Sequence, residues 1–249
     1  MTPLRFLTPL RLRILLVLCL LLVIPACTGT VRDSSLPDLQ RAYGEAIRDA
    51  EVAEPGEISR DLLAIVPSND ALRWNKEKDE ILVVTWTSWD GYDDRVGTAM
   101  ELSREVWVTV VPEVKAFCHA QRITPTQLPL RLEQLLGLPP EAGKTKFAEM
   151  WVSPEDLFRP APDPEVSDHE AELDFPVSAR FVTISEAHRR WFFDLKQRSY
   201  GAGGYPWTRL GYTYDWGNRE SEIGVSEFVI PAGATVTIHA VSDTLTYCQ

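Results

Sequence analysis

Tyrosine, tryptophan and glycine are concentrated between Tyr200 and Asn218, where the sequence reads YGAGGYPWTRLGYTYDWGN. Six of these 19 residues are Tyr or Trp and five are Gly. Flat rings with polar tips suit stacking on a sugar or gripping an extended peptide, and glycine lets a backbone approach a ligand closely. We therefore predict that this segment supplies ligand-binding residues: Tyr205, Trp207, Arg209, Tyr212, Tyr214, Asp215 and Trp216. The alternative is a long loop whose rings fold inward as a small core of its own.

A second candidate segment covers residues 86–94, at the exit of the most strongly β-forming stretch of the chain, 81–89. Trp89, Asp90 and Tyr92 are predicted to bind beside the aromatic segment, because sites often lie where a central strand ends. The carboxylates of Asp90, Asp93 and Asp94 are also the oxygen ligands that calcium prefers. Their spacing lacks the alternate acids and distal Glu of a helix–loop–helix calcium loop. A solvated acidic turn is the alternative, and no metal site is predicted.

Motifs for covalent and cofactor chemistry are missing from the sequence. Ser88 lacks the flanking glycines of a nucleophile elbow, and Cys118 and His119, as helical neighbours, would point about 100° apart. No two histidines stand four residues apart, and the glycine-rich run has no Lys-Ser or Lys-Thr after it, so neither a zinc nor a phosphate-loop signature is present. We predict no catalytic residue, no metal and no cofactor.

The N-terminal segment predicts the cellular location of the protein. Residues 1–13 carry three arginines and no acid, Ile14 to Ile24 are unbroken apolar, and Pro25-Ala26-Cys27 follows, as in a secretory signal. Ile24-Pro25-Ala26-Cys27 resembles the lipobox of bacterial lipoproteins. That resemblance covers only the export segment. It implies cleavage before Cys27, palmitate-type lipidation of Cys27, and membrane anchoring on the periplasmic or extracellular side. An uncleaved membrane anchor and an ordinary secretory signal are the alternatives.

Removing the signal segment makes an acidic chain more acidic. The full chain has 25 basic and 36 acidic residues and a formal charge of −11. Residues 1–26 hold three Arg and no acid, so the mature chain keeps 22 basic and 36 acidic residues, a net charge of −14. Such a surface repels nucleic acid and anionic headgroups. Membrane attachment is therefore expected through the lipid on Cys27, and no nucleic-acid partner is expected.

Two cysteines remain for a disulfide. Cys19 lies in the signal segment and Cys27 is assigned to the lipid, which leaves Cys118 and Cys248 in an exported protein. Oxidising compartments favour joining such a pair. We predict a Cys118–Cys248 disulfide that holds the C-terminus against the fold.

The hydrophobic pattern predicts an α+β fold with a mixed or antiparallel central sheet, packed helices and a C-terminal β-hairpin. Residues 1–26 are assigned to the signal segment, 27–34 to a tether and 35–249 to a single domain with a Pro-rich surface loop at 159–168. Helices are expected over 36–52, 58–66, 112–121, 128–136 and 185–198. Strands are expected over 81–89, 105–111, 147–152 and 180–184, and over 223–230 and 235–246, which Pro231–Gly233 would join as the hairpin.

The expected function is that of a lipid-anchored, non-catalytic envelope protein that binds a glycan or a protein partner through 200–218. An envelope hydrolase with a carboxylate pair drawn from Asp90, Asp93, Asp94 and Asp215 is one alternative. A purely structural lipoprotein is the other.

Overall fold

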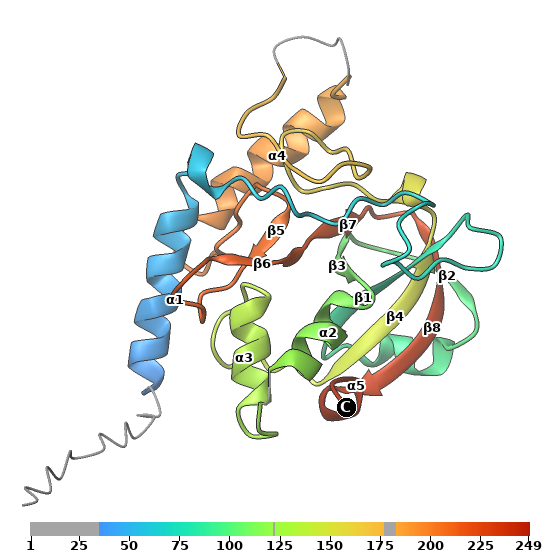
Figure 1. Ribbon diagram of the computed structural model, residues 1–249, viewed down its shortest axis with the longest axis horizontal. Coiled ribbons are helices and arrows are strands. Elements are labelled where there is room, and N and C mark those ends of the chain that lie inside the picture. Colours follow the sequence, from blue (N-terminus) through green and yellow to red (C-terminus); the bar gives the residue numbers. More distant parts are fainter. Residues whose placement is uncertain (1–34, 122, 177–182) are drawn as a thin grey trace, which may run out of the picture. The chain divides into compact units, whose positions relative to one another are not determined.

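The computed structural model describes residues 35–121, 123–176 and 183–249. The expected signal segment, tether and lipid-bearing Cys27 lie outside these residues, as does most of the strand expected at 180–184. From Ser35 onward the described chain belongs to one compact unit (Figure 1). Within it, no helix combines the length and apolar character needed to cross a membrane.

An antiparallel six-stranded sheet is the centre of the fold, so the predicted α+β class is confirmed. The order is β2-β8-β4-β1-β3-β7, and β1 is an inner strand, as its apolar sequence predicts. The strands are β1 (Ile81–Thr87), β2 (Ala99–Glu101), β3 (Val106–Val110), β4 (Lys146–Val152), β7 (Phe228–Ile230) and β8 (Thr235–Asp243).

The sheet bends at a corner where two strand pairs follow one another. Glu101 of β2 faces Thr235 of β8, and Val106 of β3 faces Ile230 of β7, in the same antiparallel register. Leu102 bridges the corner, because its N–H donates to Ala234 O at 2.9 Å. The edge strand β2 thus leads into β3, and the other edge strand, β7, leads into β8. They enclose an apolar core that includes Val83, Val108, Met150, Phe228, Ile230 and Ile238.

The predicted pairing of residues 223–230 with 235–246 is wrong in its details. The first segment divides into β6 (Ile223–Ser226) and β7, and β6 forms a two-stranded hairpin with β5 (Tyr212–Tyr214) near the C-terminus. β7 pairs with β3, whereas β8 pairs with β4 and β2. The turn at Pro231–Gly233 is present, with Gly233 at φ 88°, but it makes the corner because distant apolar strands compete successfully with the local partner.

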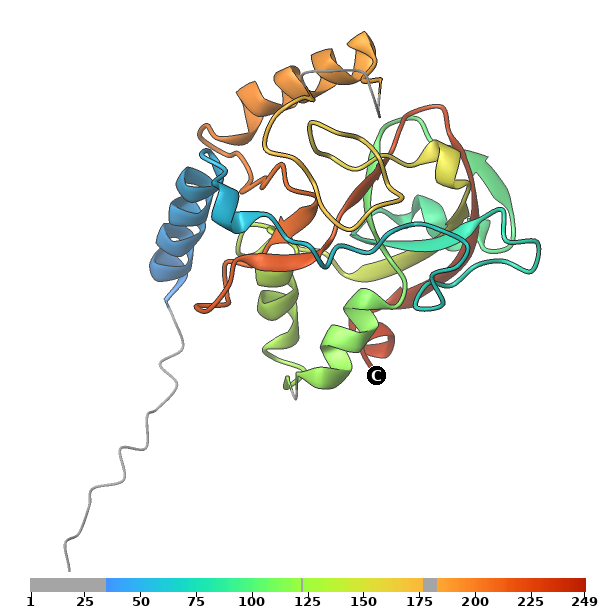
Figure 2. The same ribbon diagram turned by 45° about the horizontal axis from the view of Figure 1, so that its top comes forward.

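The helices lie on two sides of the sheet (Figures 1 and 2). α2 (Glu113–Ala120), α3 (Leu128–Leu135) and α5 (Thr244–Tyr247) cover the outer face of β1 and β4, where Leu82, Val84 and Phe147 pack. α4 (Glu186–Ser199) lies on the opposite side, and α1 (Leu36–Ala50) packs near the β5–β6 hairpin. Short 3-10 turns occupy η1 (Pro55–Glu57), η2 (Asp90–Arg95) and η3 (Pro154–Asp156). The helices predicted at 36–52, 112–121, 128–136 and 185–198 are confirmed, whereas residues 58–66 form no helix.

Residues 58–66 and the Pro-rich segment 159–168 differ from prediction together. Residues 58–66 run without helix, and Leu62 N–H and Ile65 N–H donate to His169 O and Val166 O at 3.0 and 2.7 Å. The Pro-rich segment is packed instead of lying on the surface. Its Arg159 side chain is fully buried and donates to Glu165 O and Asp168 O, both at 3.0 Å. Long-range main-chain pairing therefore replaces the expected short helix.

The predicted disulfide is confirmed. Cys118 of α2 is bonded to Cys248, which follows α5, with Cα atoms 5.2 Å apart. The bond spans 130 residues of sequence and joins the C-terminus to the helices that cover β1 and β4.

Candidate functional site

A cavity of about 770 Å³ opens where β1 and β3 separate. The two strands pair only at Val83↔Val110 and Val84↔Thr109, although both continue beyond these pairs. The cavity begins at this point and is lined by residues 84–89 on the β1 side and 104–109 on the β3 side. Its volume lies within the roughly 300–1,000 Å³ of small-ligand pockets.

Consecutive residues of both strands line the cavity, which places it between the strands and not above one face. Side chains alternate between the two faces of a strand, so a cavity above one face would contact every second residue. Val111 N–H donates to Leu82 O, and Val84 is paired with Thr109. By the two-residue period, Trp86 and Trp107 would form the next hydrogen-bonded pair.

In the described part of the chain, no sheet pairing joins Trp86 to Trp107. Their main-chain N–H and C=O groups therefore face the cavity. Buried main-chain groups almost always have a hydrogen-bond partner. The main-chain groups of Trp86 and Trp107 can therefore form hydrogen bonds with a ligand in the cavity.

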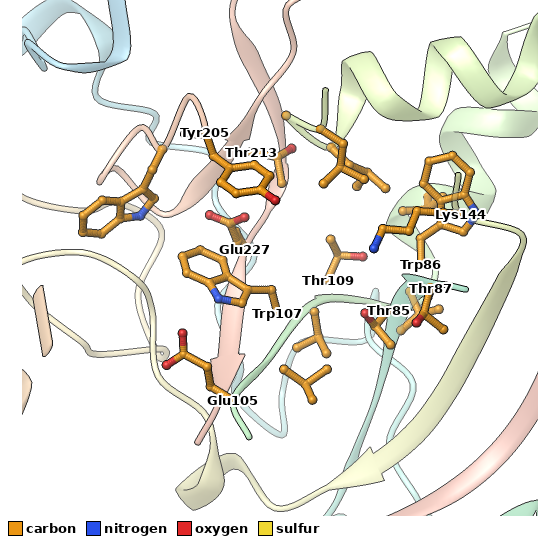
Figure 3. Close-up of a pocket in the computed structure, with 18 of the residues that line it drawn as sticks. Thr85, Trp86, Thr87, Glu105, Trp107, Thr109, Lys144, Tyr205, Thr213 and Glu227 are labelled. Atoms are coloured by element: carbon orange, nitrogen blue, oxygen red, sulfur yellow. The ribbon is translucent and has the colours of Figure 1, made fainter. Parts of the chain in front are cut away.

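Aromatic side chains from several elements form the walls (Figure 3). Trp86 stacks on Phe147, with ring centroids 5.8 Å apart, and Trp89 meets Tyr92 edge to face at 4.6 Å. On the other side, Trp107 lies 6.3 Å from Trp191 of α4. The aromatic residues that line the cavity are Trp86, Trp89, Tyr92, Trp107, Phe147, Tyr205, Trp207 and Tyr214.

Glu227 is an acidic group within this aromatic surround. It is the single residue between β6 and β7, and because Phe228 enters the core, Glu227 points to the opposite side and into the cavity. Figure 3 shows its carboxyl between the rings of Tyr205 and Trp107. Among the described residues, none forms a hydrogen bond or ion pair with this carboxyl. Glu227 is half-buried and lines the cavity, and burial raises the pKa of its carboxyl to about 8.

Other polar groups are spread around the walls. Lys144 reaches in from the side opposite Glu227 (Figure 3), and no described residue forms a salt bridge with it. Glu105 accepts a 2.8 Å hydrogen bond from Trp191 Nε1, and Arg104 lies 5.9 Å from the Trp89 ring. The buried Thr109 Oγ1 has no hydrogen-bond partner in the described chain. The polar groups thus offer both charges and unused hydrogen-bonding capacity.

Five of the ten residues predicted to bind a ligand line this one cavity, and they come from both predicted segments. They are Trp89, Tyr92, Tyr205, Trp207 and Tyr214. Tyr205 is 52% exposed, whereas Trp207 is buried. The Trp207 ring packs 5.1 Å from Phe192 of α4, and its Nε1 donates to Pro160 O at 3.1 Å. Trp207 is therefore part of the core and of the cavity wall at once.

The other five predicted residues have partners elsewhere. Asp90 is at the surface and bonds Lys146, Arg209 donates to Ala50 O and Glu51 O, and Tyr212 OH donates to Glu57 O. Trp216 Nε1 donates to Leu138 O. Asp215 is buried and accepts two hydrogen bonds, at 2.8 and 2.6 Å, from the guanidinium of Arg131. These contacts connect elements of the fold.

Three of the four carboxylates considered for a hydrolase are engaged in ion pairs, and the fourth, Asp94, is exposed and does not line the cavity. Asp90 and Asp93 share the Lys146 ammonium, each at 2.6 Å, and Asp215 is paired with Arg131. Within the described ranges, no three His, Cys, Asp or Glu side chains are placed to hold a metal ion. None of these three aspartates lines the cavity.

Sequence reasoning missed Glu227, Lys144, Trp107 and Thr109. Glu227 carries one usable signal: it is the sole charged residue in the apolar stretch Gly224–Ala234, where an acid must either find a partner or face a cavity. Trp107 and Thr109 look like ordinary strand residues. No family model, curated protein or solved structure matched the chain in comparisons with known proteins.

Proposed function

We propose that this is an exported, lipid-anchored envelope protein that binds a short carbohydrate in the cavity between β1 and β3, without catalysis. The observation that carries the proposal is the combination of ring faces with unpaired main-chain groups at Trp86 and Trp107. Sugar rings present apolar faces and peripheral hydroxyls, so flat rings and scattered hydrogen-bonding groups are complementary to them. A concave site with a volume near 770 Å³ favours such a ligand over a flat protein interface.

The location is proposed from the N-terminal sequence and supported by the disulfide. Structural disulfides persist in oxidising compartments, and Cys118–Cys248 is formed. Purified native protein should begin at Cys27 with its sulfur and amino group acylated, as mass spectrometry would reveal. An unmodified N-terminus at any other residue would contradict the lipid anchor, and Cys27→Ser should release the protein from membranes.

Tryptophan fluorescence tests binding directly, because Trp86 and Trp107 line the cavity. The full-length protein is titrated with disaccharides of N-acetylglucosamine and of glucose, and a saturable change is expected with at least one. Trp107→Leu should weaken that binding more than about 5-fold, since aromatic anchors of binding sites commonly contribute over 1 kcal/mol. Trp216→Leu is the matched control, because Trp216 does not line the cavity. Equal affinity in the two variants would place the ligand elsewhere.

A further inference from the structure

The isolated carboxyl of Glu227 defines the chemistry of the ligand more narrowly. This inference rests on the proposed function, since it assumes that the cavity is a binding site. A carboxyl enclosed by Trp107 and Tyr205, with no partner among the described residues, is costly to ionise in the empty protein. The cost falls when a cation enters, and the faces of Trp and Tyr rings also attract cations.

We propose that the ligand carries an ammonium group, which Glu227 binds as a carboxylate between the rings of Trp107 and Tyr205. The alternative use of Glu227 is as a neutral acid that donates a hydrogen bond to an uncharged ligand. Charge decides between them: the mature chain has a net charge of −14, which draws cations towards it. A neutral ligand would gain nothing from that field.

The charged groups around Glu227 leave room for such a guest. Arg104 and Glu105 precede β3, Lys144 precedes β4, and Tyr205 follows α4. Glu113 of α2 is occupied by Ser226, whose N–H and Oγ–H donate to it. Among the described residues, none of these groups bonds the Glu227 carboxyl. Lys144, across the cavity, is free to meet an oxygen-rich or anionic part of the same ligand.

Binding must release a proton. At pH 7 a carboxyl with a pKa of about 8 is roughly nine-tenths protonated. The complex forms when Glu227–COOH loses its proton to the buffer and its carboxylate meets the R–NH₃⁺ of the ligand. Calorimetry in buffers of different ionisation enthalpy should therefore find at least about half a proton released per ligand at pH 7. Affinity should rise about five- to tenfold from pH 6 to pH 7, because the ionised fraction of Glu227 does so.

Two pairs of probes, each differing by one charge, test the proposal on the full-length protein. One pair is the glucosamine disaccharide and its N-acetylated form. The other is a capped Gly-Lys-Gly peptide and its Nε-acetylated form. We expect the ammonium member of at least one pair to bind more than 10-fold more tightly at pH 7, and the pair that does so distinguishes a sugar amine from a peptide amine.

Variants identify the carboxyl responsible. Glu227→Gln keeps the shape and should abolish the preference for the ammonium member. Glu220→Gln, the same change at an exposed carboxyl that does not line the cavity, should keep it. Equal binding within both pairs, or a preference that survives Glu227→Gln, would overturn the ammonium site while leaving carbohydrate binding intact. Binding of neither sugar nor peptide would overturn both proposals. Proton release from the unaltered protein remains a test if Glu227→Gln folds poorly.

Discussion

Replacing Asp215 by Asn should destabilise the protein strongly, although Asp215 was predicted from sequence to bind a ligand. Its carboxylate is 3% exposed and accepts two hydrogen bonds from Arg131, and it also accepts one from Gly217 N–H at 3.1 Å. Asparagine removes the charge and turns an NH₂ group towards the guanidinium. Breaking a buried ion pair from one side costs about 3–5 kcal/mol.

The surroundings of Arg131 reduce this expected cost. The Arg131 side chain is 20% exposed and lies over the Phe117 ring, with its guanidinium carbon 4.6 Å from the centroid, so it keeps some solvation and a cation–π contact. We expect a loss of about 2–4 kcal/mol in the free energy of unfolding. With a urea slope of roughly 3 kcal/mol/M, the midpoint of unfolding should fall by about 1 M.

Asp90→Asn provides the matched control. Asp90 makes an ion pair of similar length, but its side chain is 84% exposed and Asp93 shares the same lysine. Its urea midpoint should equal that of the unaltered protein, because exposed ion pairs contribute little. Equal midpoints for the two variants would refute the structural role of Asp215. Ligand affinity in the cavity should be unchanged in both.

Three further changes test other parts of the structure. Cys248→Ser should lower the free energy of unfolding by about 2–5 kcal/mol because the 130-residue loop is no longer closed, and reductant should have no further effect on the variant. Trp207→Ala should cost about 3–5 kcal/mol through the cavity left beside Phe192; an unchanged melting temperature would show that the ring is not core. The pKa of Glu227 is raised on folding from 4.5 to about 8, so its contribution to stability is full below pH 4.5 and is lost as the pH rises towards 8. Glu227→Gln should therefore remove part of the loss of stability between pH 4.5 and 8, and parallel pH curves for the two proteins would contradict the burial of this carboxyl.

Local patterns of the sequence carried most of the fold. A run of β-branched and aromatic residues identified β1, and the helical spacing of apolar residues after Ser185 identified α4, because these signals arise within one element. The disulfide followed from the number of cysteines. The pairing of β7 and β8 and the extended course of residues 58–66 did not follow, since each depends on partners about 100 or more residues away.

The candidate site was predictable only in part, for a related reason. Ring-rich segments suggested binding, and Trp89 and Tyr205 do line the cavity. Their neighbours Asp215 and Arg209 have the same polar character but bind other parts of the fold. Amino-acid composition cannot distinguish a residue that lines a cavity from one that stabilises the fold. The cavity itself exists because the pairing of β1 and β3 stops after Val84 and Thr109, and the end of a strand pairing has no signature in either strand alone.

The interrupted pairing of β1 and β3 also has a consequence for hydrogen exchange. Amides inside a paired ladder exchange slowly, whereas amides without a partner exchange through local opening at much lower cost. The amides of Trp86 and Trp107 should therefore exchange quickly, although both residues lie in the middle of the sheet. The amides of the paired residues Val84 and Thr109 should exchange slowly. A molecule seated between the strands would restore protection at Trp86 and Trp107. Their exchange rates report occupancy of the cavity in whole-cell extracts, before the occupant has been identified.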